Sequence, residues 1–187
     1  PYAIAKIAGI KMCESYNRQY RRDYRSVMPS NLYGPGDNYH LENSHVVPAL
    51  LRRFHEAMTN SHKEVVVWGT GESLREFLYV DDMAEASLFI HNLDSKILNR
   101  NKKAMFSHIN IGSGIEITIH KLAETIKNVI GFKGDLLFDT SKPDGAPRKL
   151  LDCQHLNNLG WKAKTGIKSG IEQSYKDFIK NQTTLRK

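Results

Sequence analysis

A tyrosine and a lysine near the start of the chain have the spacing of a proton-transfer pair. Tyr2 and Lys6 would lie on one face of a helix, about one turn apart. A free phenol ionises at about pH 10, and a neighbouring ammonium group favours its phenolate form. The pair would therefore act as a tuned proton donor or acceptor. In a chain with 8 Tyr the same spacing also arises by chance, so an ordinary helix surface remains the alternative.

Two further runs place polar groups beside expected strands. MPSNLYGP, residues 28–35, predicts a strand that ends in a glycine–proline turn, and such carboxyl ends bind ligands in open α/β sheets. LREFLYVDDMAEA, residues 74–86, places Arg75 before a strand and Asp81 and Asp82 after it. The arginine suits a phosphate, and one of the two aspartates is expected to cap a helix. A plain strand exit and a surface arginine are the alternatives.

A histidine and an arginine pair form another candidate. His45 follows Asn43 and Ser44 at an expected helix start, and a histidine there can donate or accept a proton near neutral pH. Arg53, next to Arg52, could contact a phosphate through two hydrogen bonds. A structural histidine and a solvated arginine pair are the alternatives.

The run NRQYRRDYR, residues 17–25, points to a different class of partner. Its interleaved arginine and tyrosine side chains suit phosphate contacts and stacking on nucleic-acid bases. Arginines near a helix C-terminus also satisfy the helix dipole. Because the other basic residues are scattered, a nucleic-acid interface is not favoured.

Composition limits the class of protein. Of the 187 residues, 40% are hydrophobic and 25% are charged, which is typical of a globular protein with a real core. The formal net charge of +7 favours an anionic partner. No apolar run reaches the roughly 20 residues of a membrane span, and Cys13 and Cys153 are too few for a disulfide scaffold. A reducing cytoplasm is therefore the default expectation.

Several chemistries lack their sequence signatures. No cysteine pair has zinc spacing, no His-x-x-x-His is expected on a helix, and we expect no metal site. There is also no nucleophile elbow, no Walker loop and no Gly-x-Gly-x-x-Gly.

Strands and helices alternate along the chain, so the predicted fold class is α/β. The patterns predict helices at 3–20, 45–58 (capped by Asn43 or Ser44), 82–93, 118–131 (closed by Gly131) and 167–181, and strands within 23–33, 65–69, 76–80, 106–112 and 136–141. Residues 95–103 are expected to form an exposed connection, and KPDGAPRK, residues 142–149, contains a turn.

Taken in order, these motifs resemble one family. The chain resembles the extended short-chain dehydrogenases/reductases that act on nucleotide sugars, which have a similar ordered set of motifs. The set is Tyr-x-x-x-Lys, Asn-x-Tyr-Gly-Pro, Arg-x-Phe-x-x-Val-x-Asp and a C-terminal Leu-Gly-Trp. Nearly the whole chain resembles the branch that makes GDP-L-fucose. The long similar runs are PYAIAKIAGIKMCESYNRQY, NSHVVPALLRRFHEA, REFLYVDDMAEAS, SHINIGSG and SKPDGAPRKLLD.

The resemblance implies the C-terminal part of an NAD(P)-binding Rossmann-type sheet plus a smaller α/β substrate-binding domain. Residues 1–34 would end the dinucleotide-binding domain, 35–75 would bind substrate, 76–114 would return to the sheet and 115–187 would form the C-terminal substrate-binding domain. In the family, the glycine-rich cofactor loop, a catalytic serine and the epimerising cysteine precede the tyrosine. We therefore expect a fragment that is inactive alone, in which Cys13 and Cys153 do not match that cysteine. Arg21 stands where the family has glycine.

The resemblance also implies a reaction and its residues. The expected activity converts GDP-4-keto-6-deoxy-mannose to GDP-L-fucose by 3,5-epimerisation and NADPH-dependent reduction at C4. Tyr2, Lys6 and His45 would be catalytic, with His45 as the epimerisation acid. The cofactor NADP(H) would contact Lys6, His45 and the run Pro29, Ser30, Asn31 and Leu32. The substrate-binding residues would be Arg53, Trp68, Arg75, Asp144 and Lys149. A GDP-sugar and a second copy of the protein are the expected partners, with no nucleic acid and no membrane.

Two alternatives remain open at this point. A GDP-mannose dehydratase or a UDP-hexose 4-epimerase shares the Tyr–Lys pair and the Asn-x-Tyr-Gly-Pro run, whereas His45 and the 142–149 loop favour the GDP-L-fucose branch. A non-catalytic nucleotide-binding module is the alternative from another class, because the glycine-rich loop is missing.

Overall fold

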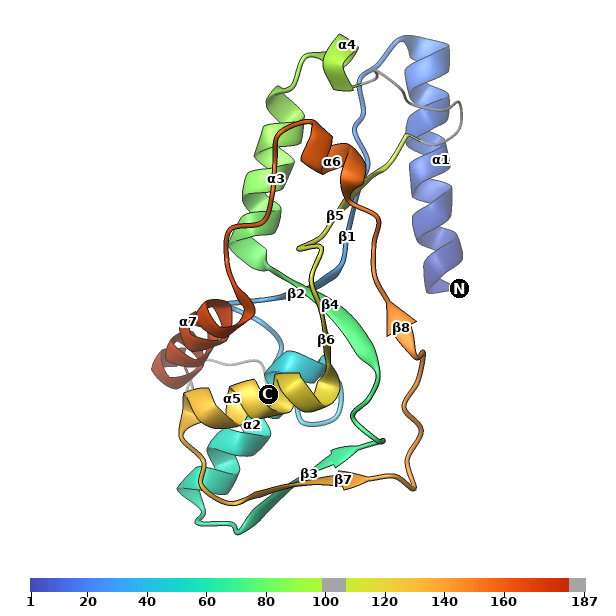
Figure 1. Cartoon of the computed structure of the whole chain (residues 1–187). Helices are drawn as coiled ribbons and strands as arrows, with labels where there is room; N and C mark the ends of the chain where they lie inside the picture. The colour runs from blue at the N-terminus through green and yellow to red at the C-terminus, as the bar shows by residue number, and fades with distance from the viewer. Residues whose placement is uncertain (99–106, 182–187) are drawn as a thin grey trace.

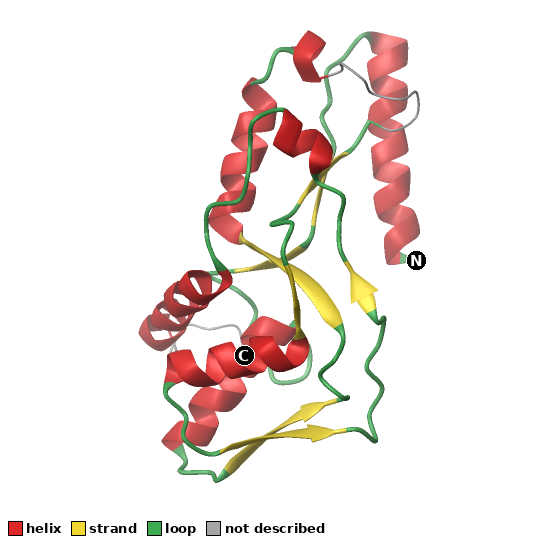
Figure 2. Cartoon of the chain, in the orientation of Figure 1, coloured by secondary structure: helices red, strands yellow, loops and turns green. Residues whose placement is uncertain are grey.

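The computed structural model describes residues 1–98 and 107–181, and it confirms the expected α/β class (Figures 1 and 2). The helices are α1 (Tyr2–Tyr20), α2 (Val46–Thr59), α3 (Val80–Asn92), α4 (Ser95–Leu98), α5 (Ile119–Ile130), α6 (Gln154–Asn158) and α7 (Ile167–Asn181). The strands are β1 (Val27–Pro29), β2 (Asn31–Tyr33), β3 (Glu64–Trp68), β4 (Leu74–Tyr79), β5 (Ile109–Ile111), β6 (Glu116–Thr118), β7 (Asp135–Asp139) and β8 (Arg148–Lys149). The expected exposed connection lies partly outside the described residues. No helix within those two ranges is long and apolar enough to cross a membrane.

The strands form small, mainly parallel sheets. β1 pairs with β5, β2 pairs with β4, and β3 pairs with β7, all in parallel. β4 also pairs with β8 in parallel and with β6 in antiparallel orientation. Ser30 alone separates β1 from β2, and its amide donates to the carbonyl of Ile111 at 2.9 Å. The chain therefore passes from one parallel pair to the next at a single residue.

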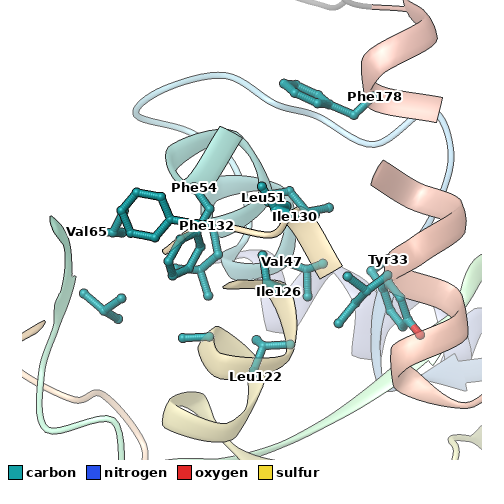
Figure 3. Packing of buried hydrophobic residues seen from close by; sticks show 14 of the residues in the cluster. Tyr33, Val47, Leu51, Phe54, Val65, Leu122, Ile126, Ile130, Phe132 and Phe178 are labelled. Carbon is teal, nitrogen blue, oxygen red and sulfur yellow. The ribbon is translucent and has the colours of Figure 1, made fainter. Parts of the chain in front are cut away.

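The main hydrophobic core lies between α2, α5 and α7, in the lower part of Figure 1. Phe54 and Leu51 of α2 face Leu122 and Ile126 of α5 in this core (Figure 3). The apolar residues of α5 recur at helical spacing, so burying one stripe of the helix leaves its polar face to solvent.

A second core lies around α3, β5 and α6, and strand β4 contributes to both cores. Leu78 packs in the second core, whereas its neighbours Phe77 and Tyr79 pack in the main one. Successive side chains of a strand point to opposite faces, so β4 is a shared wall. Ile111 and Trp161 also pack in the second core.

Helix α1 stands along one side of the molecule, and most of it is exposed (Figure 1). Its one buried residue is Glu14, whose carboxylate accepts hydrogen bonds from the amide and hydroxyl of Ser107 at 3.2 and 2.8 Å. Apolar side chains such as Ile7 and Met12 are exposed on this helix. The helix is thus attached near its C-terminal half while its N-terminal half lacks a packed partner among the described residues.

The residue that follows α1 has an unusual backbone conformation. Arg21 caps the helix with φ 51° and ψ 44°, in the left-handed region. A glycine adopts this conformation without the steric cost that a Cβ atom adds. The position where the family has glycine therefore does require a left-handed residue, and arginine is strained there.

Two of the expected caps are wrong. Helix α2 is capped by His45 rather than by Asn43 or Ser44, and the His45 side chain makes no capping hydrogen bond. Helix α3 is capped by Tyr79, because Asp81 and Asp82 already lie in its first turn. Buried Asp82 instead accepts hydrogen bonds from the segment before α7. Its donors are the amides of Lys164 and Thr165, at 3.1 and 2.9 Å, and the Thr165 hydroxyl at 3.0 Å.

The expected end of α5 is confirmed. Gly131 is its C-cap, with φ 85° in the left-handed region. At the other end Thr118 is the N-cap, and its hydroxyl accepts a hydrogen bond from the amide of Lys121 at 3.0 Å. Both features are ordinary helix-end chemistry that the sequence signals directly.

Candidate active site

The structure places the Tyr–Lys pair on one face of α1. Nζ of Lys6 lies 5.3 Å from the centroid of the Tyr2 ring. Tyr2 is 76% exposed, so its hydroxyl is open to a ligand. The ammonium group therefore lies at cation–π distance from the phenol ring, on the same face of the helix, as the proton-transfer interpretation expects.

His45 lies at the start of α2, on an element different from that of the Tyr–Lys pair. Its ring is exposed, and its carbonyl accepts the hydrogen bond from Ala49 that opens the helix, at 2.9 Å. Burial raises the pKa of the nearby Asp37 carboxyl, while the Asn38 amide and a charged His45 lower it. A protonated His45 therefore has a partly buried carboxyl group within electrostatic range.

The expected cofactor run follows the carboxyl end of β1. Pro29, Ser30, Asn31 and Leu32 lie where β1 and β5 end side by side. The Ser30 hydroxyl is buried, and among the described residues it has no hydrogen-bond partner. The Asn31 amide is used internally, donating to the carbonyl of Glu76 at 2.7 Å. This edge thus presents one unpaired polar atom beside the exposed side chain of Leu32.

Trp68 is the centre of the expected substrate site. It ends β3 and is 63% exposed. Cζ of Arg53 lies 5.8 Å from its ring centroid, and Nζ of Lys142 lies at the same distance of 5.8 Å. The sequence analysis singled out Arg53 and Trp68 but missed Lys142, although Lys142 opens the turn segment at residues 142–149.

Asp144 is expected to bind substrate, and in this structure its carboxylate holds a turn. It accepts hydrogen bonds from the hydroxyl and the amide of Thr70, at 2.8 and 2.7 Å, and both lower its pKa. A Cβ atom on Gly69 would lie 2.2 Å from this carboxylate, so only glycine fits there. Asp144 therefore links the loop before β8 to the turn between Trp68 and Arg75.

Arg75 and Lys149 lie side by side. They are register partners on the parallel strands β4 and β8. Arg75 donates to the carbonyl of Leu74 at 2.8 Å, and Asp144 lies within its electrostatic range. Next to this pair is a shallow cavity of about 350 Å³, which is lined by Arg148, Leu150, Leu151 and Asp152.

Glu76 is a buried carboxylate that the sequence analysis did not single out. It is 0% exposed, and its two oxygens accept hydrogen bonds from the amides of Gly114 at 2.7 Å and Leu151 at 3.1 Å. Its carbonyl accepts the bond from Asn31. Glu76 therefore ties the cofactor-side run to the segment that follows Lys149. A glutamate in a short strand gives no sequence signal of such burial.

The structure thus brings the five expected substrate residues into one connected group. Arg53 contacts Trp68, Asp144 fixes the turn that follows Trp68, and Arg75 borders both the Asp144 loop and Lys149. Tyr2 and Lys6 lie together on α1, and His45 begins α2. The roles of these residues remain predictions.

This α/β fold, with a Tyr–Lys pair on its first helix, is that of a dehydrogenase-like protein. A sequence profile described as the NAD dependent epimerase/dehydratase family matches residues 1–112. The chain belongs to this family.

Among curated proteins, the chain is similar to GDP-L-fucose synthases. It is 58% identical to "GDP-L-fucose synthase" of Escherichia coli over 186 residues, which cover 100% of this chain and 58% of that protein. It is 52% identical to "Probable GDP-L-fucose synthase 1" of Oryza sativa, covering 100% of this chain and 54% of the relative. The chain spans about half the length of the curated relatives it matches.

Solved structures show the same fold. A GDP-L-fucose synthetase from Naegleria fowleri bound to NADP has a TM-score of 0.86 and 30% sequence identity, covering 100% of this chain and 57% of that one. A GDP-6-OMe-4-keto-L-xylo-heptose reductase from Campylobacter jejuni has a TM-score of 0.84 and 39% identity, covering 96% and 60%. The Rossmann-type neighbours agree with the expected fold class.

Proposed function

We propose that this chain is the substrate-binding and proton-transfer part of an enzyme that makes GDP-L-fucose from GDP-4-keto-6-deoxy-mannose. The observation that carries the proposal is the connected group of Arg53, Trp68, Arg75 and Lys149 in a chain 58% identical to such a synthase. Arg53 lies beside the exposed Trp68 indole, and Arg75 and Lys149 are register partners on neighbouring strands. Such cations suit a nucleoside diphosphate, because phosphates favour charge-assisted hydrogen bonds. The relatives' names supply the sugar.

The epimerisation follows from the chemistry of the 4-keto sugar. Hydrogens at C3 and C5 are acidic because the carbanion left behind delocalises into the C4 carbonyl. Inversion needs a base on one face of the sugar and an acid on the other. We assign the acid to His45, whose exposed ring has a carboxyl, that of Asp37, within electrostatic range. The base is expected from the part of the relatives that this chain does not span.

The reduction needs a hydride and a proton. When bound, NADPH would supply the hydride to C4. The Tyr2 hydroxyl protonates the alkoxide that develops on O4, and the Lys6 ammonium stabilises the phenolate left behind. Lys6 would also hold the ribose of the cofactor. His45 would make a second side-chain contact with the cofactor. The buried, unpaired Ser30 hydroxyl at the carboxyl edge of β1 fits a cofactor contact, together with the backbone of Pro29, Asn31 and Leu32.

The proposed substrate residues have two kinds of role, neutralising charge and providing an apolar surface. Arg53, Arg75 and Lys149 neutralise the diphosphate, and Trp68 provides a flat apolar wall. Asp144 keeps the turn between Trp68 and Arg75 in place through Thr70. Within this proposal, residues 35–75 and 115–187 form the substrate side, and residues 1–34 and 76–114 complete the dinucleotide-binding side.

The setting and assembly are also part of the proposal. The two cysteines, Cys13 and Cys153, are free thiols, which suits a reducing cytoplasm. Exposed apolar side chains on α1, including Ile7 and Met12, favour association, and we propose a homodimer for the complete protein.

A chimaera tests the proposed function. The part of the Escherichia coli relative that precedes its match is fused to this chain, and the product is assayed with GDP-4-keto-6-deoxy-mannose and NADPH. We expect GDP-L-fucose to form with NADPH consumption. The Tyr2→Phe chimaera should lose turnover by roughly 10²–10⁴-fold but keep its affinity for GDP. A folded chimaera that leaves this substrate unchanged would contradict the proposed function, and full turnover by the Tyr2→Phe variant would remove Tyr2 from the mechanism.

A further inference from the structure

Lys142 shares the Trp68 indole with Arg53. Both cationic groups lie 5.8 Å from the centroid of the Trp68 ring. Arg53 comes from α2 and Lys142 comes from the loop after β7, so two distant segments bring positive charge to one aromatic side chain. Because Trp68 is largely exposed, the space beside this group is open to a ligand.

The loop that carries Lys142 is anchored on both sides. The amide of Lys142 donates to the carbonyl of Asp139 at 3.2 Å, and Asp139 is the register partner of Trp68. Two residues further on, Asp144 accepts hydrogen bonds from the amide and hydroxyl of Thr70. The backbone of residue 142 is therefore fixed beside the indole, and only the lysine side chain needs to move.

The Lys142 side chain has competing partners at this position. Its ammonium group lies over the indole and within electrostatic range of the Asp139 carboxylate, whose pKa is lowered first by the hydroxyl and amide of Ser141 and also by Lys142. The hydroxyl of Ser141 already donates to that carboxylate at 2.6 Å. A diphosphate offers a lysine stronger charge-assisted hydrogen bonds than an exposed aromatic ring does.

We propose that Lys142 is a further specificity-determining residue that leaves the Trp68 indole and binds the diphosphate of the nucleotide when the nucleotide sits against Trp68. The inference rests on the proposed function, because it takes the group around Trp68 as the nucleotide site. Lys142 then works with Arg53 from the other segment. Together they select a diphosphate over a monophosphate or a nucleoside.

Tryptophan fluorescence of the 187-residue chain tests the inference. The chain has 2 Trp, and Trp161 is only 4% exposed, so quenching by an added nucleotide reports mainly on Trp68. The probes are GDP, UDP, GMP and guanosine. We expect Lys142→Met to weaken GDP binding by about tenfold, GMP binding by less and guanosine binding not at all.

Two further variants control for charge and structure. Lys176→Ala removes a lysine from the exposed face of α7 and should leave GDP binding unchanged. Lys142→Arg keeps the charge and should restore most of the affinity lost in Lys142→Met. In the chimaera, Lys142→Met should raise KM for the GDP-sugar and leave kcat unchanged.

The outcomes separate the inference from the proposed function. Unchanged GDP binding in Lys142→Met, or an equal loss for GDP and guanosine, would overturn the role of Lys142. Equal binding of UDP and GDP would count against a GDP-sugar substrate, while the loss of UDP affinity in Lys142→Met would still support the diphosphate contact. Absence of quenching by every probe in the wild-type chain would overturn both.

Discussion

The substrate side and helix α1 differ in how they hold their functional residues. On the substrate side, Trp68 and Arg75 lie on strands that are braced by Asp144, by β8 and by the main core. On α1, the Lys6 ammonium lies over the Tyr2 ring, and the helix around these two residues is exposed. The group around Trp68 is held by several neighbouring elements, whereas the Tyr–Lys pair lies on a helix that is open on one side.

This difference shows that the spacing of the Tyr–Lys pair and its position relative to the rest of the molecule have separate causes. The Tyr–Lys spacing comes from one helix and needs no tertiary contact. The distance from Tyr2 to the proposed substrate depends on how α1 is held against the rest of the chain. The described contacts of Glu14 with Ser107 fix only the C-terminal half of the helix.

The largest expected effect separates the two regions chemically. In the chimaera, His45→Gln should slow the incorporation of solvent deuterium at C3 and C5 by roughly 10²–10⁴-fold, because the proton donor on the substrate side is removed. Tyr2→Phe should leave that exchange intact while it blocks reduction. Mass spectrometry of the recovered sugar measures both. Wild-type exchange in His45→Gln would exclude the histidine from the epimerisation.

A pair of truncations compares the packing of the two regions. Phe54→Ala empties a site that is 0% exposed and should lower the free energy of unfolding by about 3–5 kcal/mol. Ile7→Ala removes an exposed side chain of α1 and should change it by no more than about 0.5 kcal/mol. Chemical denaturation of the 187-residue chain measures both values. Equal losses would mean that α1 is packed as firmly as the main core.

The two cysteine thiols are expected to differ in their effect on the pH dependence of stability. Burial raises the pKa of Cys153 to about 11, whereas an unfolded thiol ionises at about 8.5. Between about pH 8.5 and about pH 10, below the range in which tyrosines ionise, the Cys153 thiol loses its proton first in the unfolded chain. Stability therefore falls as pH rises in this window, by ~1 kcal/mol per pH unit. The wild type and Cys13→Ala should share this slope, and Cys153→Ala should lose it. Identical slopes in all three would show that Cys153 does not titrate in this way.

The smallest expected effect concerns the end of α1. Arg21→Gly relieves the left-handed strain at φ 51° and should stabilise the chain, by about 0.5–1 kcal/mol after the entropy of glycine is counted. Thermal unfolding checks this change, with Arg22→Gly as the matched control that should not stabilise. A lower midpoint for Arg21→Gly would mean that the arginine side chain makes a compensating contact.

Local signals predicted much of the fold and only part of the candidate site. The helix at 167–181 and the glycine end of α5 follow from apolar spacing and cap chemistry, and both are confirmed. The cap expected from Asp82 is wrong because its carboxylate binds Thr165, which is distant in sequence. The buried brace at Glu76 and the approach of Lys142 to Trp68 likewise depend on which segments meet, and no local pattern encodes that.

The position of strand β4 between the two cores limits how such proteins can evolve by recombination. Leu78 belongs to one core, while Phe77 and Tyr79 belong to the other. The two cores are therefore interleaved along the chain, and no contiguous piece carries the whole of one core without part of the other. Recombination between family members at a single crossover would pair mismatched halves of both cores. We expect nucleotide specificity at the proposed site around Trp68 to change by single substitutions rather than by exchange of modules.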